Sequence, residues 1–172
     1  MEVILIRHGE PDYKKARKYF KGIGHNYAEL TLDGEKQAYE RSKDPRLAGA
    51  ELIISSPYTR SLQTAAIISR EINLPIKIET NLHEWFPDMK FIHDYDIHQS
   101  YLEFIEHRGI VTYRRKYRWE SYLDLQQRTR EAILPYKEKY QKVIVVCHAM
   151  VMGAFTHIDD EIEYCGVRVI NL

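Results

Sequence analysis

A three-layer α/β/α sandwich with a mostly parallel central sheet is the fold class that this 172-residue sequence predicts. Short apolar runs alternate along the chain with longer amphipathic stretches, a pattern typical of repeated β–α units. Two of these runs, VILI and VIVVC, are continuous enough for strands buried on both faces. Each is followed within two residues by a histidine, which a parallel sheet would bring to its carboxyl edge.

The first half of the chain supplies two predicted strands and two predicted helices. Residues 3–6 form the first strand, and a long polar segment, 11–27, follows it. Thr31 is a candidate N-cap because a run of good helix formers comes directly after it. A second strand lies within residues 50–56, and apolar residues at helical spacing predict a helix within 58–74.

The second half continues the alternation. Residues 74–80 alternate like a short strand, and residues 121–140 form a long amphipathic helix that we expect to bend or break near Pro135. The clearest buried strand is 142–147. Residues 166–172 alternate well enough to form a last strand, which we place at an edge of the sheet.

The length of the chain predicts one domain over residues 1–172, since it suffices for one full hydrophobic core. Residues 85–118 are rich in aromatic and charged side chains and lack the repeating β–α pattern. We therefore interpret this segment as an insertion into the alternating fold.

Composition narrows the classes of partner. The 25 basic and 25 acidic residues balance, so the net charge indicates neither nucleic acid nor an anionic membrane as a partner. One cluster, YRRKYRW, is weak support for nucleic-acid binding.

Cys147 and Cys165 match neither a disulfide framework nor a metal-binding spacing, which predicts reduced structural thiols. No signal peptide or long apolar stretch is evident, so the expected location is the cytoplasm. The oligomeric state stays open.

Polar groups that can bind an anion follow three predicted strands. Arg7 and His8 follow the first, Arg60 lies in the turn after the second, and His148 follows VIVVC. The carboxyl ends of parallel strands meet at one edge, so these side chains are expected to converge. Guanidinium groups match phosphate oxygens in paired geometry, and the predicted anion is therefore phosphate.

Five motifs carry a resemblance to a known family. RHGE, LTLDGEKQA, SSPYTRSLQTA, NLHEW and VVCHAM occur in this order. Together they resemble the histidine phosphatase superfamily, which has the phosphoglycerate-mutase-like fold, and the likeness spans most of the chain. The resemblance makes 85–118 a specificity insertion. Because this insertion matches no subfamily closely, the alcohol of the substrate stays open.

The resemblance implies catalytic roles for these residues. His8 is expected to be the nucleophile that forms a phosphohistidine, with its other ring nitrogen held by a carbonyl in the Gly9 turn. Arg7, Arg60 and His148 are expected to bind and stabilise the phosphoryl group. No metal or cofactor is required, since the arginines neutralise the phosphate.

Proton transfer to the leaving alcohol is expected from Glu84, which stands in NLHEW where the family has its general acid. Its aromatic neighbours predict a raised pKa, which suits an acid that works near neutral pH. Glu10 and His83 are weaker candidates for the same step. His25 is a candidate for the border of the substrate pocket, although a solvated loop histidine fits the sequence equally well.

Three functions fit these residues. The first is a metal-independent phosphomonoesterase that acts on a small phosphorylated metabolite. The alternatives are a phosphoglycerate-type mutase, which would need longer segments to close over its site, and a non-catalytic phosphate-binding protein on the same fold.

Two basic runs predict that the substrate carries anionic groups beyond the phosphate that is cleaved. They lie in the loop after His8 and at the end of the insertion, and consist of Lys14, Lys15, Arg17, Lys18 and Lys21, and of Arg114, Arg115, Lys116 and Arg118. If both flank the pocket mouth, they attract anions. Solvated helix faces paired with nearby carboxylates explain both runs equally well.

Overall fold

A five-stranded sheet forms the centre of the computed structural model, which describes residues 1–19, 23–90 and 96–172. The strands are β1 (Glu2–Arg7), β2 (Leu52–Ser55), β3 (Ile76–Ile78), β4 (Lys142–Cys147) and β5 (Val167–Asn171), in the order β3-β2-β4-β1-β5. The first four run parallel, and β5 pairs antiparallel with β1 at one edge. The predicted mostly parallel sheet and its last edge strand are confirmed.

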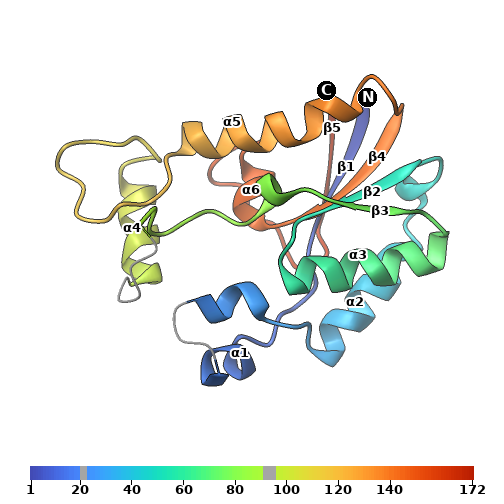
Figure 1. The fold of residues 1–172 in the computed structure, drawn as a ribbon, viewed down its shortest axis with the longest axis horizontal. Helices are drawn as coiled ribbons and strands as arrows, with labels where there is room; N and C mark the ends of the chain where they lie inside the picture. The colour runs from blue at the N-terminus through green and yellow to red at the C-terminus, as the bar shows by residue number, and fades with distance from the viewer. Residues whose placement is uncertain (20–22, 91–95) are drawn as a thin grey trace.

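Helices cover both faces of this sheet, as the predicted sandwich requires (Figure 1). Helices α5 (Tyr122–Ile133) and α6 (Ala149–Gly153) pack with one set of strand side chains, and α3 (Thr59–Ile72) packs with the other. Helix α2 (Leu32–Ser42) lies against α3. Because alternate residues of a buried strand face opposite layers, residues 3–6 of β1 and 143–147 of β4 are apolar without interruption.

Local sequence signals set several helix ends. The Thr31 hydroxyl accepts a hydrogen bond from the Gly34 amide at 3.0 Å, which confirms the predicted N-cap of α2. Helix α3 ends at Ile72 and is capped by Asn73, which has a φ of 54°. Helix α5 ends at Ile133, and a 3-10 turn over Leu134–Tyr136 contains Pro135, so the expected break is also confirmed.

Two segments contain helices that the sequence pattern does not indicate. Helix α4 (Ile97–Glu106) lies within the segment 85–118, of which residues 91–95 fall outside the described ranges. The Asp96 carboxylate accepts hydrogen bonds from two amides in its first turn. Buried Phe104 of α4 packs with Trp85 and Trp119 against the α5 face of the sheet.

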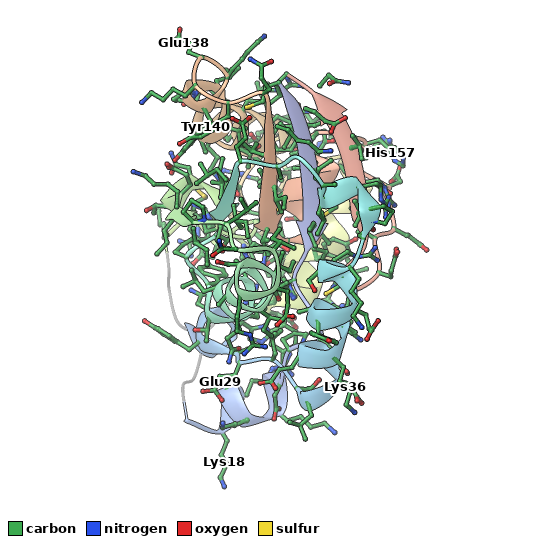
Figure 2. The ribbon with its side chains drawn as sticks, turned by 90° about the vertical axis from the view of Figure 1, so that its right-hand side faces the viewer. Lys18, Glu29, Lys36, Glu138, Tyr140 and His157 are labelled. Carbon is green, nitrogen blue, oxygen red and sulfur yellow. The ribbon has the colours of Figure 1, made fainter. Side chains whose placement is uncertain are left out.

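The polar segment after β1 forms helix α1 (Tyr13–Tyr19) and a 3-10 turn over Ile23–Tyr27. Figure 1 places α1 beyond the carboxyl edge of the sheet, at the end opposite to both chain termini. In Figure 2, Lys18 and Glu29 mark this end, and Glu138 and Tyr140 mark the other. Two further 3-10 turns cover Pro45–Leu47 and Thr80–Leu82.

Both cysteines are free and buried, as expected for structural thiols. Burial raises the pKa of Cys165 to about 12 and shifts the pKa of Cys147 in the same direction. In the described ranges, none of the helices combines the length and the apolar character that a membrane span requires.

Candidate active site

Three neighbouring strand ends bring the predicted phosphate-binding residues together. Strand β1 pairs with β4 so that Arg7 lies opposite Cys147, which sets His8 beside His148. The two imidazole rings meet edge to face, with their centroids 5.2 Å apart. Strand β2 lies on the other side of β4, and Arg60 enters from the first turn of the helix that follows it. The convergence therefore follows from the register of the sheet.

Arg60 links these groups through its buried guanidinium. Its Nε donates to Nε2 of His8 at 3.0 Å, and its Nη2 lies 3.2 Å from Nδ1 of His148. Its Nη1 donates to the backbone carbonyl of His25 at 2.5 Å. One cation thus faces a nitrogen of each imidazole, an arrangement that favours neutral rings and attracts an anion.

The ring of His8 is held in one orientation. Its Nδ1 lies 2.8 Å from the Gly9 carbonyl, so Nδ1 carries the proton and Nε2 keeps its lone pair. This confirms the expected carbonyl in the Gly9 turn. A side chain at Gly9 would meet the Gly34 carbonyl oxygen at 2.5 Å, which explains why glycine is needed here. Burial, then the charge of Arg60, holds the pKa of His8 well below its ordinary value of 6.5.

His148 is fixed by residues that the sequence motifs contain but the site prediction omits. Its Nε2 lies 2.7 Å from the Ser56 hydroxyl and 3.5 Å from that of Ser61. Because Nδ1 faces Arg60, Nε2 carries the proton and donates to Ser56. Burial, followed by Arg60, also lowers the pKa of His148 well below 6.5. The position of Ser56 within SSPYTR is the signal that could have identified it.

Arg7 retains a donor for a ligand. Its Nη1 donates to the Ile162 carbonyl at 2.5 Å, and its guanidinium stacks 4.2 Å from the ring centroid of Tyr164. Among the described residues, its Nε is buried and has no hydrogen-bond partner. An unpaired buried donor is unfavourable, and an anion beside His8 would satisfy it.

Glu84 lies in a cavity of about 220 Å³ together with Arg60. The Trp85 amide donates to the Glu84 carboxylate at 2.8 Å. Burial raises the pKa of Glu84 above its ordinary value of 4.5, and this backbone hydrogen bond and nearby arginines partly oppose the shift. The pKa of Glu84 is therefore raised, as expected, and the main cause is burial of the carboxyl group.

Other predicted residues lie at varying distances from this cavity. His25 lines it, stacks on Tyr13 at 4.6 Å and accepts a hydrogen bond from Nε of Arg17 at 2.9 Å. The Glu10 carboxylate instead accepts from the Thr31 hydroxyl at 3.2 Å, and Glu10 is not part of the cavity wall. His83 also lies outside this wall, and its Nδ1 hydrogen-bonds the Glu84 carbonyl at 2.8 Å.

A buried ion pair that the sequence does not indicate supports the loop carrying Glu84. Arg128 of α5 binds the carboxylate of Glu120 at 2.5 and 2.9 Å. Its Nη1 also donates to the carbonyls of Asn81 and His83 at 2.6 and 2.9 Å. Nothing in an amphipathic pattern separates this inward-facing arginine from an exposed one, so only the fold identifies it.

Arg128→Met is expected to lower the free energy of unfolding by about 3–5 kcal/mol, because it leaves the Glu120 carboxylate buried without its partner. Urea denaturation measures this loss. Arg130→Met, an exposed change on the same helix, is the matched control and should stay within about 0.5 kcal/mol of the parent. Equal stability of the two variants would contradict a supporting role for Arg128.

Metal-binding residues do not gather here. Across residues 1–19, 23–90 and 96–172, no three His, Cys, Asp or Glu side chains cluster as metal ligands would. The groups that converge are two arginines and two imidazoles, with a carboxyl group nearby.

Comparison with known proteins relates this arrangement to a family. Residues 3–162 match the model of the histidine phosphatase superfamily (branch 1). A relative from Salmonella paratyphi C, named "Probable phosphoglycerate mutase GpmB", is 33% identical over 84 residues, which is 49% of this chain. The match covers 38% of that relative's length.

Solved structures share the fold at low sequence identity. Mycobacterial glucosyl-3-phosphoglycerate phosphatase superposes with a TM-score of 0.75 at 17% identity, over 99% of this chain and 90% of that one. The α-ribazole phosphatase of Shigella flexneri gives a TM-score of 0.71 at 21% identity, over 100% and 91%. The family match over residues 3–162 includes both histidines and both arginines of the site, and this chain belongs to the histidine phosphatase superfamily.

Proposed function

We propose that this protein is a phosphomonoesterase that hydrolyses a small phosphate ester through a phosphohistidine at His8. The observation that carries this proposal is the contact of Arg60 with both imidazoles, since it puts a fixed cation beside an oriented, neutral nucleophile. The names of similar structures, which include two phosphatases of small phosphorylated molecules, agree with this chemistry.

In the first step, the phosphoryl group takes over the hydrogen bond that Nε of Arg60 donates to Nε2 of His8. The lone pair that this frees on Nε2 attacks phosphorus while the bond from phosphorus to the ester oxygen breaks. Glu84 gives its proton to the departing alkoxide, and the alcohol leaves. The hydrogen bond from Nδ1 to the Gly9 carbonyl holds the ring in line and stabilises the positive charge that develops on it. The phosphoryl group is then bound to His8.

In the second step, the Glu84 carboxylate takes a proton from water as the water oxygen attacks phosphorus. The bond to His8 breaks, inorganic phosphate leaves, and Glu84 is protonated again. Arg7 and Arg60 stabilise the charge on the equatorial oxygens in both steps. His148 joins them when the phosphate replaces its contact with Arg60, with the proton then on Nδ1 and Nε2 accepting from the Ser56 hydroxyl. The unpaired Nε of Arg7 supports its place among these donors.

The pKa shifts of His8 and Glu84 predict the pH dependence. The nucleophile must be neutral, and because its pKa is lowered, kcat/KM falls on the acid side only well below pH 6.5. The general acid must be protonated, and because its pKa is raised above 4.5, kcat/KM for an alkyl phosphate falls as pH rises through that higher value.

An activated aryl phosphate needs no proton on its leaving group. The fall of kcat/KM at alkaline pH should therefore be smaller for the aryl phosphate than for an alkyl phosphate. Glu84→Gln should also slow hydrolysis of the alkyl phosphate far more than that of the aryl phosphate. Steady-state kinetics on both substrates measure the difference. An equal loss on both would remove Glu84 from the role of acid.

Release of inorganic phosphate from a panel of phosphate esters tests the proposed function directly. A phosphoglycerate supplied with a bisphosphoglycerate primer distinguishes the mutase alternative. We expect phosphate release, and isomerisation without release would favour the mutase. A protein that binds phosphate but turns over no ester would favour the non-catalytic alternative.

The contacts of the basic runs bear on the expected second anion. Lys15 pairs with Glu29, Arg17 contacts His25, and Arg118 pairs with Asp88 at 3.1 Å. Lys21 lies outside the described residues. The pairs of Lys15 and Arg118 match the alternative of charges paired with carboxylates, whereas Arg17 contacts an imidazole in the wall of the Glu84 cavity. The substrates compared below therefore include one that carries a second anionic group.

A further inference from the structure

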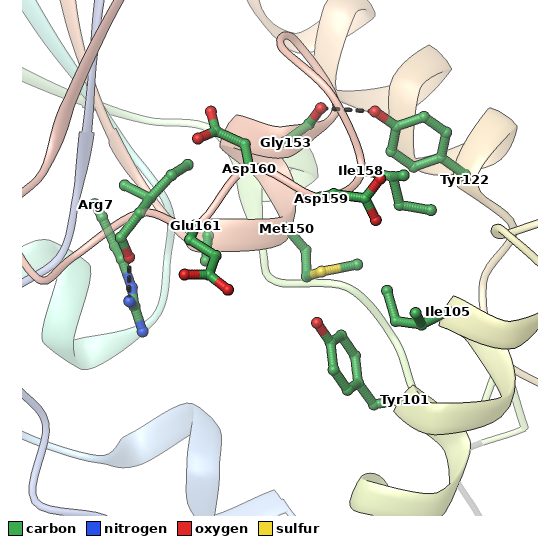
Figure 3. A pocket seen from close by; sticks show the side chains of 12 residues that line it. Arg7, Tyr101, Ile105, Tyr122, Met150, Gly153, Ile158, Asp159, Asp160 and Glu161 are labelled. Atoms are coloured by element: carbon green, nitrogen blue, oxygen red, sulfur yellow. Dashed lines mark hydrogen bonds between the residues drawn. The ribbon is translucent and has the colours of Figure 1, made fainter.

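A second cavity, of about 400 Å³, lies beside the candidate active site (Figure 3). Arg7 stands at one side of it, and Tyr101 and Ile105 of α4 stand at another. The chain after α6 closes it through Ile158 and Glu161, among others. The volume is sufficient for a small organic group, and the wall combines apolar and acidic side chains with the guanidinium of Arg7.

This cavity shares wall residues with the cavity that contains Glu84. Tyr101 and Met150 line both cavities. Arg7, whose charge acts on both His8 and Glu84, joins the larger cavity to the phosphate-binding residues. An alcohol bonded to a phosphoryl group at His8 would leave past Glu84, and the larger cavity is the adjoining space that can hold its remainder.

The charges in the wall are not equivalent. Asp159 pairs with Arg108 at 3.1 Å, and Asp160 pairs with Arg168 at 2.6 Å. Within the described residues, the carboxylate of Glu161 has no hydrogen-bond or ion-pair partner. Figure 3 shows Glu161 and Tyr101 pointing into the cavity from different walls. Glu161, an exposed residue, therefore contributes a negative charge that no ion pair among the described residues neutralises, and Arg7 contributes a positive charge to the same wall.

We propose that this cavity receives the alcohol of the phosphate ester, and that Glu161 favours an alcohol that carries an ammonium group. The proposal rests on the phosphomonoesterase function argued above and names the class of substrate for it. The ammonium would donate to the Glu161 carboxylate, while its alkyl chain packs against Met150 and Ile158. A carboxylate at the same point would meet a like charge and be disfavoured.

The test uses three alkyl phosphates of similar length. They are 3-aminopropyl phosphate, butyl phosphate, in which a methyl group replaces the ammonium, and 3-carboxypropyl phosphate. The ratio of kcat/KM between two substrates is measured within each variant, so a general change in activity cancels. The parent, Glu161→Gln and Glu161→Lys are compared.

We expect Glu161→Gln to lower the ratio of aminopropyl to butyl phosphate by about two- to fivefold, the range of one partly exposed ion pair. Glu161→Lys should lower it further and raise the ratio for carboxypropyl phosphate. Glu163→Gln is the matched control, because Glu163 is an exposed carboxylate two residues away that lines neither cavity. Its ratios should equal those of the parent.

Several outcomes would overturn the inference. Ratios that do not change in Glu161→Gln, or that change equally in Glu163→Gln, would remove Glu161 from substrate selection. The parent could instead prefer carboxypropyl phosphate and lose this preference in the double variant Arg114→Glu with Arg115→Glu. That result would overturn the inference and support a substrate with a second anionic group. If the parent releases no phosphate even from an aryl phosphate, the proposed function itself fails.

Discussion

His8→Ala is expected to lower kcat/KM for an aryl phosphate by at least about 10³-fold, because alanine offers no nitrogen to bond phosphorus. An activated ester is the right substrate, since its leaving group needs no proton and the loss then reports on the nucleophile alone. Phosphate release, measured at saturating and subsaturating substrate, gives the change in kcat and in KM.

The buried position of His8 requires a check on folding. Far-ultraviolet circular dichroism and urea denaturation show whether the variant keeps the parent's structure. His98→Ala replaces an exposed histidine in the first turn of α4 and should retain the parent's activity. Appreciable turnover by a folded His8→Ala variant would contradict the proposed nucleophile.

Arg60→Met is expected to reduce kcat/KM by about 10³-fold or more, the range seen when an arginine that stabilises a transferring phosphoryl group is removed. The loss has two physical causes. The phosphate loses a buried cation, and Nε2 of His8 and Nδ1 of His148 lose the group that holds them together. Arg60→Lys keeps the charge but loses the planar guanidinium and its fixed set of donors, so this variant should recover only part of the activity.

Arg70→Met is the matched control for this change. Arg70 lies on the same helix α3, is exposed and pairs with Glu71. Its activity should equal that of the parent. Full activity in Arg60→Lys would show that charge alone suffices and that the contacts with the two imidazoles do not matter for catalysis.

The fold is largely predictable from this sequence because its strands are buried on both faces. Residues 3–6 and 143–147 admit only apolar side chains, and the histidines after them fall at one edge once the strands are parallel. The N-cap at Thr31 and the break at Pro135 are predictable for local reasons, since a hydroxyl cap and a missing amide act within one turn.

The remaining parts depend on contacts between distant segments. Helix α4 is held by packing of Phe104 between Trp85 and Trp119, so its short pattern says little in isolation. The pair of Arg128 and Glu120 is buried only because α5 lies against the Glu84 loop. The position of Glu161 is also not predictable from the sequence, because its cavity forms only where α4 approaches the chain after α6.

The stereochemical course at phosphorus tests the proposed mechanism most directly. A phosphate ester made chiral at phosphorus with oxygen isotopes is turned over in the presence of an acceptor alcohol, and the configuration of the transferred group is read by phosphorus NMR. Attack by His8 followed by attack by the acceptor inverts phosphorus twice, so we predict net retention. Net inversion would mean a single direct displacement and would contradict a phosphohistidine intermediate.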